Sequence, residues 1–294
     1  MTLALTVLEI VAPVFLLAAT GYIWVRLGAE YPVPFVTRLA MTVAVPCLIF
    51  TALVETEIAP DVLRDTAAAT VLAYALVGAA FWAGLRLSGL SQRTFWAPLT
   101  FGNTGNLGLP VALFAFGAEG LSLAVVVFAL MAVMSFTLGV WVVSGGGSVW
   151  RALSEPLVAA TLAGLVCLIF GMTPPVWAMN TLGLVGQLGI PLMLITLGVA
   201  ISRLRPSALG RALSLSVGKL ALTAGAAFAA AWLIGLSGTA AGVLVLQLTT
   251  PVAVTNYMLA EKYGADAAEV AGLVVVSTLL AVVSIPLILA GFVV

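Results

Sequence analysis

The sequence predicts an all-helical membrane protein that crosses the bilayer ten times, as two five-helix halves in inverted orientation. Three observations support this prediction. First, 63% of the 294 residues are hydrophobic and only 7% are charged, whereas soluble domains have about 25% charged residues. Second, the charged residues cluster between apolar runs of roughly 20 residues, long enough to cross about 30 Å of hydrocarbon as helices. Third, the two halves of the chain match each other.

Ten membrane spans are predicted where apolar runs are bounded by glycine, proline or charge. They cover residues 3–27, 33–54, 63–88, 94–117, 120–144, 153–171, 175–202, 208–236, 239–261 and 267–293. The first run contains Glu9 and has no basic residue before Arg26, so we interpret it as a retained span and not as a signal peptide. Cys47 and Cys167 lie inside apolar runs, where small buried thiols are expected instead of a disulfide.

An internal repeat relates the two halves. Pro13 and Gly21 of the first span match Pro156 and Gly164 of the sixth, 143 positions further on. The offset grows to 145 in spans two and seven, to 147 in spans three and eight and in spans four and nine, and to 149 in spans five and ten. A drift in one direction through every span is hard to obtain by chance. Because each half has an odd number of spans, the second half enters the bilayer from the opposite side.

The repeat and the basic residues predict the organisation and orientation of the chain. The first repeat covers residues 1–144, a glycine-rich linker 145–152, and the second repeat 153–294. Lysine and arginine mark the cytoplasmic side of a membrane. Eight arginines lie at or near the connections after spans one, three, five and seven: Arg26, Arg38, Arg86, Arg93, Arg151, Arg203, Arg205 and Arg211. Both termini are therefore expected on the outer face of the cell (inner) membrane.

Spans four and nine contain helix breakers at mid-membrane depth. Residues 101–110 read FGNTGNLGLP and residues 249–256 read TTPVAVTN. Within hydrocarbon, an unsatisfied backbone polar group costs several kcal/mol, so a broken helix is tolerated only around a cavity. Two interrupted spans at matched positions indicate the binding site of a transporter. The alternative interpretation is that these residues are packing glycines and self-satisfied Asn and Thr between closely packed helices.

The chemistry of such a site favours an anion. A helix that begins at the bilayer centre presents free N–H groups and about half a positive charge, which attract a carboxylate. Amides and hydroxyls in the two breaks would orient the polar head of the substrate. The candidate substrate-binding residues are Asn103, Thr104, Asn106, Pro110, Thr249, Thr250, Pro251 and Asn256.

Four further residues stand out inside the spans. Lys219 is the only charged residue well inside a span, and a central lysine costs about 2.5–3.5 kcal/mol, so a role in charge compensation or coupling is expected unless its long side chain reaches the cytoplasmic surface. Gln187 lies one turn before Pro191 and is a weaker candidate for the same cavity. Pro46 and Pro191 occupy matched positions and are interpreted as kinks.

Several functional classes are disfavoured by composition. The chain contains no histidine and two cysteines, so the usual ligands of zinc, haem and copper are missing. No carboxylate lies as deep as Lys219, and no nucleophile has a histidine base. We therefore expect no enzymatic activity, no metal site and no cofactor, and nothing suggests nucleic acid as a partner.

These motifs resemble the auxin efflux carrier family, which includes plant carriers and bacterial members described as malonate transporters. The resemblance covers the span pattern of the whole chain. It is based most specifically on the pattern Asn103-x-x-Asn106-x-Gly108-x-Pro110, and further on Thr250-Pro251 with Asn256, on Phe116-Gly117 and on Pro156. The long cytoplasmic loop of many plant members is absent. The resemblance implies a substrate site where broken spans four and nine cross, with Asn103, Asn106, Pro110, Pro251 and Asn256 as its residues.

The resemblance further implies an elevator mechanism of alternating access. A scaffold domain of residues 1–54 and 153–202 would hold a transport domain of residues 63–144 and 208–294, and the scaffold helices would form a homodimer in the lipid bilayer. The implied substrate is a small organic anion, either an auxin-like aromatic acid or a malonate-like carboxylate. A passive anion channel that uses the same helix ends is the alternative.

Overall fold

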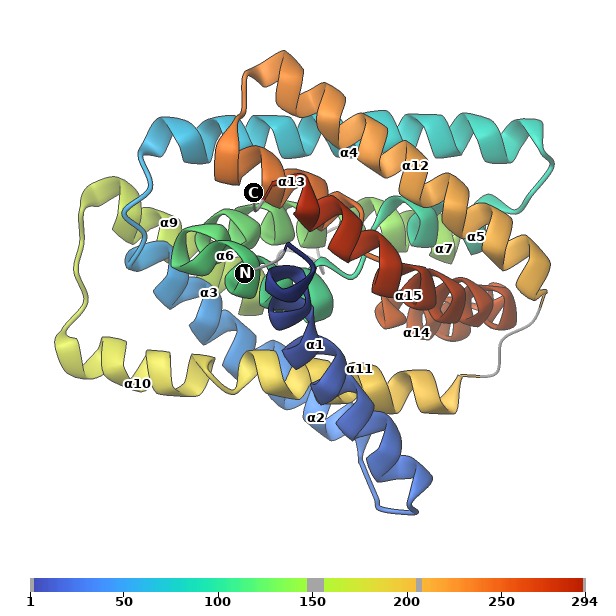
Figure 1. Ribbon diagram of the computed structural model, residues 1–294, viewed down its shortest axis with the longest axis horizontal. Helices are drawn as coiled ribbons and strands as arrows, with labels where there is room; N and C mark the ends of the chain where they lie inside the picture. Colours follow the sequence, from blue (N-terminus) through green and yellow to red (C-terminus); the bar gives the residue numbers. More distant parts are fainter. Residues whose placement is uncertain (1–2, 147–155, 205–207, 293–294) are drawn as a thin grey trace.

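The computed structural model describes residues 3–146, 156–204 and 208–292, and these residues form a helical protein without a named strand (Figure 1). Six of the described segments are long and apolar enough to cross a membrane: Val33–Val54, Pro60–Leu87, Thr104–Ser144, Val176–Arg203, Leu209–Ile234 and Ala267–Ala290. The predicted all-helical, multi-pass membrane protein is confirmed at this level. The ten crossings and their inverted arrangement remain predictions.

The first half of the chain contains these elements: α1 Leu3–Arg26, α2 Val33–Leu39, η1 Ala40–Ala44, α3 Val45–Val54, α4 Pro60–Leu87, α5 Gln92–Thr100, η2 Thr104–Gly108, α6 Leu109–Met134, η3 Ser135–Gly139 and α7 Val140–Ser144. The three η elements are π-helical turns that continue into the next helix. Pro46 is the second residue of α3, which begins directly after the π-helical turn η1, and the kink expected there stays a prediction.

The second half contains α9 Pro156–Phe170, α10 Val176–Gly186, α11 Gly189–Arg203, α12 Leu209–Ile234, α13 Gly238–Leu248, α14 Val254–Tyr263 and α15 Ala267–Ala290. Most of the predicted linker, with Arg151, lies outside the described residues, as does Arg205. In the view of Figure 1, α4 lies along one long edge of the molecule and α10 and α11 along the other, α12 runs obliquely across α4, and α6 and α13 lie between the two edges.

The helix from Thr104 to Ser144 folds back on itself. As one straight helix it would be about 60 Å long at 1.5 Å per residue, twice the thickness of the hydrocarbon core. Gly117 has φ 66° and ψ −155°, which interrupts α6. The side chain of Gln247 borders Gly108 and donates to the carbonyl of Ala124 at 3.4 Å. Gly108 and Ala124 are 16 residues apart, yet both contact Gln247. The segments before and after Gly117 therefore form a hairpin.

Helices approach each other closely at glycines, which have no side chain. A Cβ at Gly21 of α1 would overlap the carbonyl of Ile195 in α11, and one at Gly198 of α11 would overlap the carbonyl of Ala18. Gly164 of α9 packs against the side chain of Leu53 in α3. Small residues allow membrane helices to approach backbone to backbone. The pairs α1–α11 and α3–α9 are therefore each packed closely.

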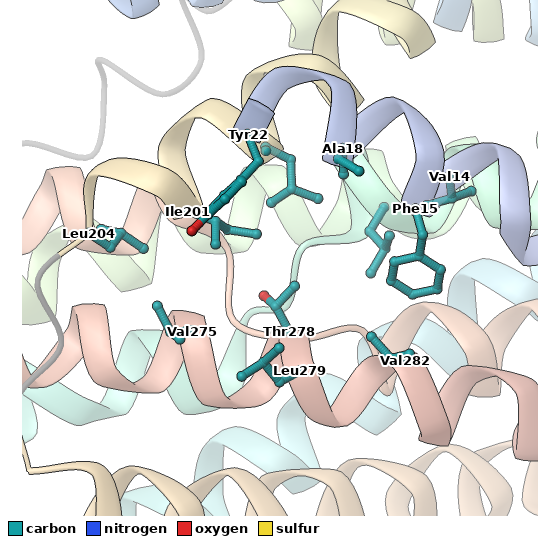
Figure 2. A pocket seen from close by; sticks show the side chains of 14 residues that line it. Val14, Phe15, Ala18, Tyr22, Ile201, Leu204, Val275, Thr278, Leu279 and Val282 are labelled. Atoms are coloured by element: carbon teal, nitrogen blue, oxygen red, sulfur yellow. The ribbon is translucent and has the colours of Figure 1, made fainter. Parts of the chain in front are cut away.

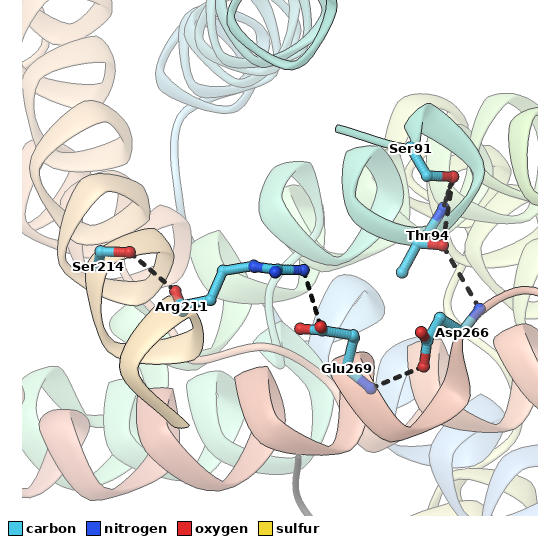
Figure 3. A network of polar contacts seen from close by, with 6 residues as sticks. All are labelled: Ser91, Thr94, Arg211, Ser214, Asp266 and Glu269. Atoms are coloured by element: carbon cyan, nitrogen blue, oxygen red, sulfur yellow. Dashed lines mark hydrogen bonds and ion pairs between the residues drawn. The ribbon is translucent and has the colours of Figure 1, made fainter. Parts of the chain in front are cut away.

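A polar network joins the ends of α5, α12 and α15 (Figure 3). Arg211 forms an ion pair with Glu269 at 2.8 Å. The Asp266 carboxylate caps α15 by accepting a hydrogen bond from the Glu269 N–H at 3.1 Å. Thr94 Oγ1 accepts from the Asp266 N–H at 3.4 Å, and Ser91 caps α5 by accepting from the Thr94 N–H at 3.3 Å. These three helices are therefore held together at one end.

Large apolar side chains cover much of the outer surface. Trp232, Trp177 and Phe170 are 80%, 73% and 72% exposed. A water-soluble protein rarely exposes contiguous apolar surface on this scale. In a bilayer the same side chains face lipid, so the surface agrees with a membrane protein.

Candidate functional site

The two predicted breaks lie against each other. The chain is non-helical between α5 and η2 and again between α13 and α14. Gly102 and Val252 form an antiparallel β-bridge, and the Asn103 N–H donates to the Pro251 carbonyl at 2.7 Å. The two interrupted segments therefore cross at their breaks.

Each break has a local cause in the sequence. Pro251 has no N–H, which removes one helical hydrogen bond. Gly102 provides the space for the crossing, because a Cβ there would overlap the side chain of Thr250. Asn256 Nδ2 donates to the Phe101 carbonyl at 3.2 Å, and the Val252 N–H donates to Ser277 Oγ at 2.9 Å. The freed backbone groups thus find partners inside the protein, as a position within hydrocarbon requires.

Two helices begin beside one small cavity at the crossing. One begins with η2 at Thr104 and continues into α6, and the other is α14, which begins at Val254. The cavity has a volume of about 70 Å³ and includes Asn103, Asn106 and Asn256 in its lining. No charged side chain is among the described residues that line it. Two positive helix ends without a compensating carboxylate favour an anion.

Asn103 provides a free donor to this cavity. Its side chain is 4% exposed, and its Nδ2 has no hydrogen-bond partner within the described part of the protein. Although Asn103 precedes the first turn of η2, its side chain does not cap the helix. A buried donor without a partner costs about 1–3 kcal/mol, so a ligand that accepts from Nδ2 would recover this energy.

Three hydroxyl side chains, those of Thr37, Ser135 and Thr255, also line the cavity, and the rest of its lining is apolar or aromatic. Phe101, Phe128 and Phe136 contribute rings, while Met41 of η1 and Met131 of α6 contribute flexible side chains. Pockets that enclose drug-sized ligands measure roughly 300–1,000 Å³. A cavity of about 70 Å³ is therefore matched to the head of a small molecule, with hydrocarbon contacts next to the polar group.

Lys219 lies in a different cavity. Its side chain is 2% exposed, and Nζ donates to the Thr250 carbonyl at 2.8 Å. Thr249, Pro251 and three serines line the same space of about 10 Å³: Ser216, Ser277 and Ser284. Thr250 lies two residues after the last residue of α13, so the Lys219 amino group satisfies a carbonyl just past the end of that helix. Lys219 neither reaches the surface nor lines the amide-containing cavity.

The predicted residues therefore separate into groups. Asn103, Asn106 and Asn256 meet in one cavity, whereas Thr249, Thr250 and Pro251 line the space beside Lys219. Thr104 and Pro110 are buried at the start of η2 and α6. Gln187 is exposed at the end of α10 and lines neither cavity. Gln187 directly follows the last residue of α10, and Pro191 is the third residue of α11, so the kink expected at Pro191 stays a prediction.

Sequence reasoning missed two buried polar residues of the crossing. Gln247 is fully buried in α13 beside Gly108, and its Oε1 has no partner within the described residues. Ser277 of α15 accepts the hydrogen bond from Val252. A signal was present for both: an amide lies three positions before Thr250 in an apolar run, and a serine lies in the middle of the tenth span.

The apolar helices and the comparisons with known proteins together define a multi-pass membrane transport protein. A family model described as membrane transport protein matches residues 6–148 and 141–289. The chain is 30% identical to an uncharacterized transporter of Methanothermobacter thermautotrophicus over 95% of this chain and 96% of that protein. It is 28% identical to an uncharacterized transporter of Methanocaldococcus jannaschii over 60% of this chain and 61% of that protein.

The chain belongs to the membrane transport protein family, which is the auxin efflux carrier family. The resemblance stated from the fourth-span and ninth-span motifs is therefore confirmed. The family and the relatives indicate a transporter and not an enzyme.

Proposed function

We propose that this protein is a secondary-type carrier of small organic anions, with its substrate site in the cavity at the crossing of the two broken spans. The observation that supports this most is the convergence of two helix N-termini on a cavity without a described charged lining residue. The unpaired Asn103 amide provides a directed donor at the same place. A carboxylate satisfies all three features at once.

The lining of the cavity favours a carboxylate with a compact apolar body. Three phenylalanines and two methionines surround the amides, and aromatic side chains stack on flat ligands while methionine adapts to irregular ones. An auxin-like aromatic acid would use the rings, and a malonate-like acid would use only the polar head. Both remain within the proposed substrate class.

The proposed mechanism is an elevator-type movement in an inverted five-plus-five fold. Two features support it. The hairpin at Gly117 separates a fourth from a fifth helical segment, and the close packing of α1 on α11 corresponds under the repeat to that of α9 on α3. The polar network of α5, α12 and α15 connects helices of the proposed transport domain. The scaffold helices would form a homodimer, with both termini on the outer face of the inner membrane.

Transport assays in proteoliposomes test this function. Vesicles preloaded with unlabelled malonate or indole-3-acetate should accelerate uptake of the same labelled acid, and uptake should saturate. Internal substrate accelerates uptake only if the binding site of a carrier moves back across the membrane with that substrate bound. Linear, unsaturated flux with unitary currents would instead support the anion-channel alternative, and no flux of either acid would contradict the proposed substrate class.

A further inference from the structure

An apolar groove runs between α1, α11 and α15 (Figure 2). Its volume is about 480 Å³. Phe15 and Ala18 of α1 face Leu279 and Val282 of α15 across it (Figure 2). Apart from Tyr22 and Thr278, the lining side chains are hydrocarbon or glycine.

A second groove of about 480 Å³ lies between α3, α4, α6 and α9. Its walls are again apolar, with Leu53, Leu63 and Leu165 among them. Arg64 is the one charged residue in the described lining. Its side chain is 74% exposed and forms an ion pair with Asp65 at 2.9 Å, so the guanidinium lies at the surface of the protein.

The two grooves are built from corresponding residues of the internal repeat. Val275, Thr278 and Leu279 of α15 line the first groove, and they stand 149 positions after Val126, Ala129 and Leu130 of α6, which line the second. On the facing helices, Ala19 and Tyr22 of α1 correspond to Leu162 and Leu165 of α9, 143 positions later. The two grooves have equal volumes and equivalent lining residues. The same kind of groove is therefore formed twice in the molecule, from corresponding residues of the two repeats. Under the predicted orientation, the first groove lies in the cytoplasmic half of the bilayer and the second in the outer half.

We infer that each groove binds an acyl chain of a membrane phospholipid, one from each leaflet. An apolar cavity of about 150 Å³ stays dry and admits hydrocarbon ligands, and an unfilled void loses its dispersion contacts. In a bilayer the hydrocarbon next to a groove is lipid. At the second groove, the exposed guanidinium of Arg64 complements the lipid phosphate, whereas no described charged residue lines the first.

This inference concerns lipid binding and is tested without any transport substrate. The purified protein is stripped of lipid, reloaded with dioleoylphosphatidylethanolamine, and examined by native mass spectrometry under stepwise activation. The wild type should retain two lipid molecules at collision energies that remove all other bound lipids. Ala19→Phe, which fills the first groove, and Ala67→Phe, which fills the second, should each lose one of the two.

Matched variants separate groove binding from general surface adsorption. Ala229→Phe, at an exposed position of α12 outside both grooves, should retain both lipids. Arg64→Gln should weaken retention of one lipid by about two- to fivefold, as expected for loss of an exposed charge contact, whereas Arg86→Gln at the other end of α4 should not. If Ala67→Phe does not fold, Leu162→Ser provides the second test. Equal retention in the wild type and the groove variants would overturn the inference.

Discussion

At the scale of single residues, the three asparagines at the crossing determine how the cavity recognises a ligand. Asn103 and Asn256 are each 4% exposed, and Asn256 is engaged with the Phe101 carbonyl, whereas Asn103 Nδ2 is unpaired within the described residues. Asn256 is therefore expected to maintain the crossing, and Asn103 to bind the ligand. Asn106 is only partly buried and lines the cavity.

Asn103→Asp should abolish uptake of organic anions and leave the fold intact. The carboxylate suits a position before a helix N-terminus, but it places a negative charge where the anionic substrate must bind. Asn106→Ala should lower uptake by about 10- to 100-fold, because a hydrogen bond to a charged group is worth about 1.5–3 kcal/mol. Uptake is measured in proteoliposomes and folding by thermal unfolding. Asn180→Ala, at an exposed position of α10, is the control, and normal uptake by both site variants would exclude these residues.

Lys219 leads to a prediction about stability. Because Nζ donates to the Thr250 carbonyl in a buried position, Lys219→Met leaves that carbonyl without this partner. The loss should be about 1–3 kcal/mol. Lys219→Gln keeps a donor and should lose less. Thermal unfolding in detergent measures both variants, and equal stability of Lys219→Met and the wild type would show that the contact contributes nothing.

At the scale of elements, the crossing depends on how closely two chain segments approach. Gly102→Ala introduces a Cβ that overlaps Thr250, so the bond from the Asn103 N–H to Pro251 should be lost and stability should fall by about 1–3 kcal/mol. Gly218→Ala is the matched control, since Gly218 lies in α12 with open space around it. That variant should gain about 0.5–1 kcal/mol. If the close approach matters, thermal unfolding shows a loss of stability in Gly102→Ala and a gain in Gly218→Ala. A change in the same direction in both variants would contradict it.

Helix positions were predictable from the sequence, but the directions of side chains were not. Hydrophobic length and breakers located the interruptions at 101–110 and 249–256, because a proline or a glycine acts on the backbone where it stands. The side of the helix on which a residue lies depends on helix rotation, which only packing determines. Lys219 and Gln187 illustrate this: both were candidates for the cavity, yet Lys219 donates to a carbonyl just past the end of α13 and Gln187 is exposed.

At the scale of the whole molecule, each groove is formed by both halves of the chain, and so is the crossing of the two breaks. The α1–α11–α15 groove combines one helix of the first half with two of the second, and the crossing combines one break from each. Neither half contains a finished site. The sequence therefore locates both breaks, whereas the individual bonds between them, from the Asn103 N–H to the Pro251 carbonyl and from Asn256 to the Phe101 carbonyl, become evident only in the folded chain.

The hydrogen bond between Asn103 and Pro251 also has a consequence for biosynthesis. When residues 92–116 enter the membrane, the groups that will satisfy their break, at positions 251–256, have not been made. About 140 residues later, or roughly 7–28 s at 5–20 residues per second, the Asn103 N–H and the Phe101 carbonyl gain their native partners. During that interval the exposed break is the natural point for misfolding or for protection by the insertion machinery.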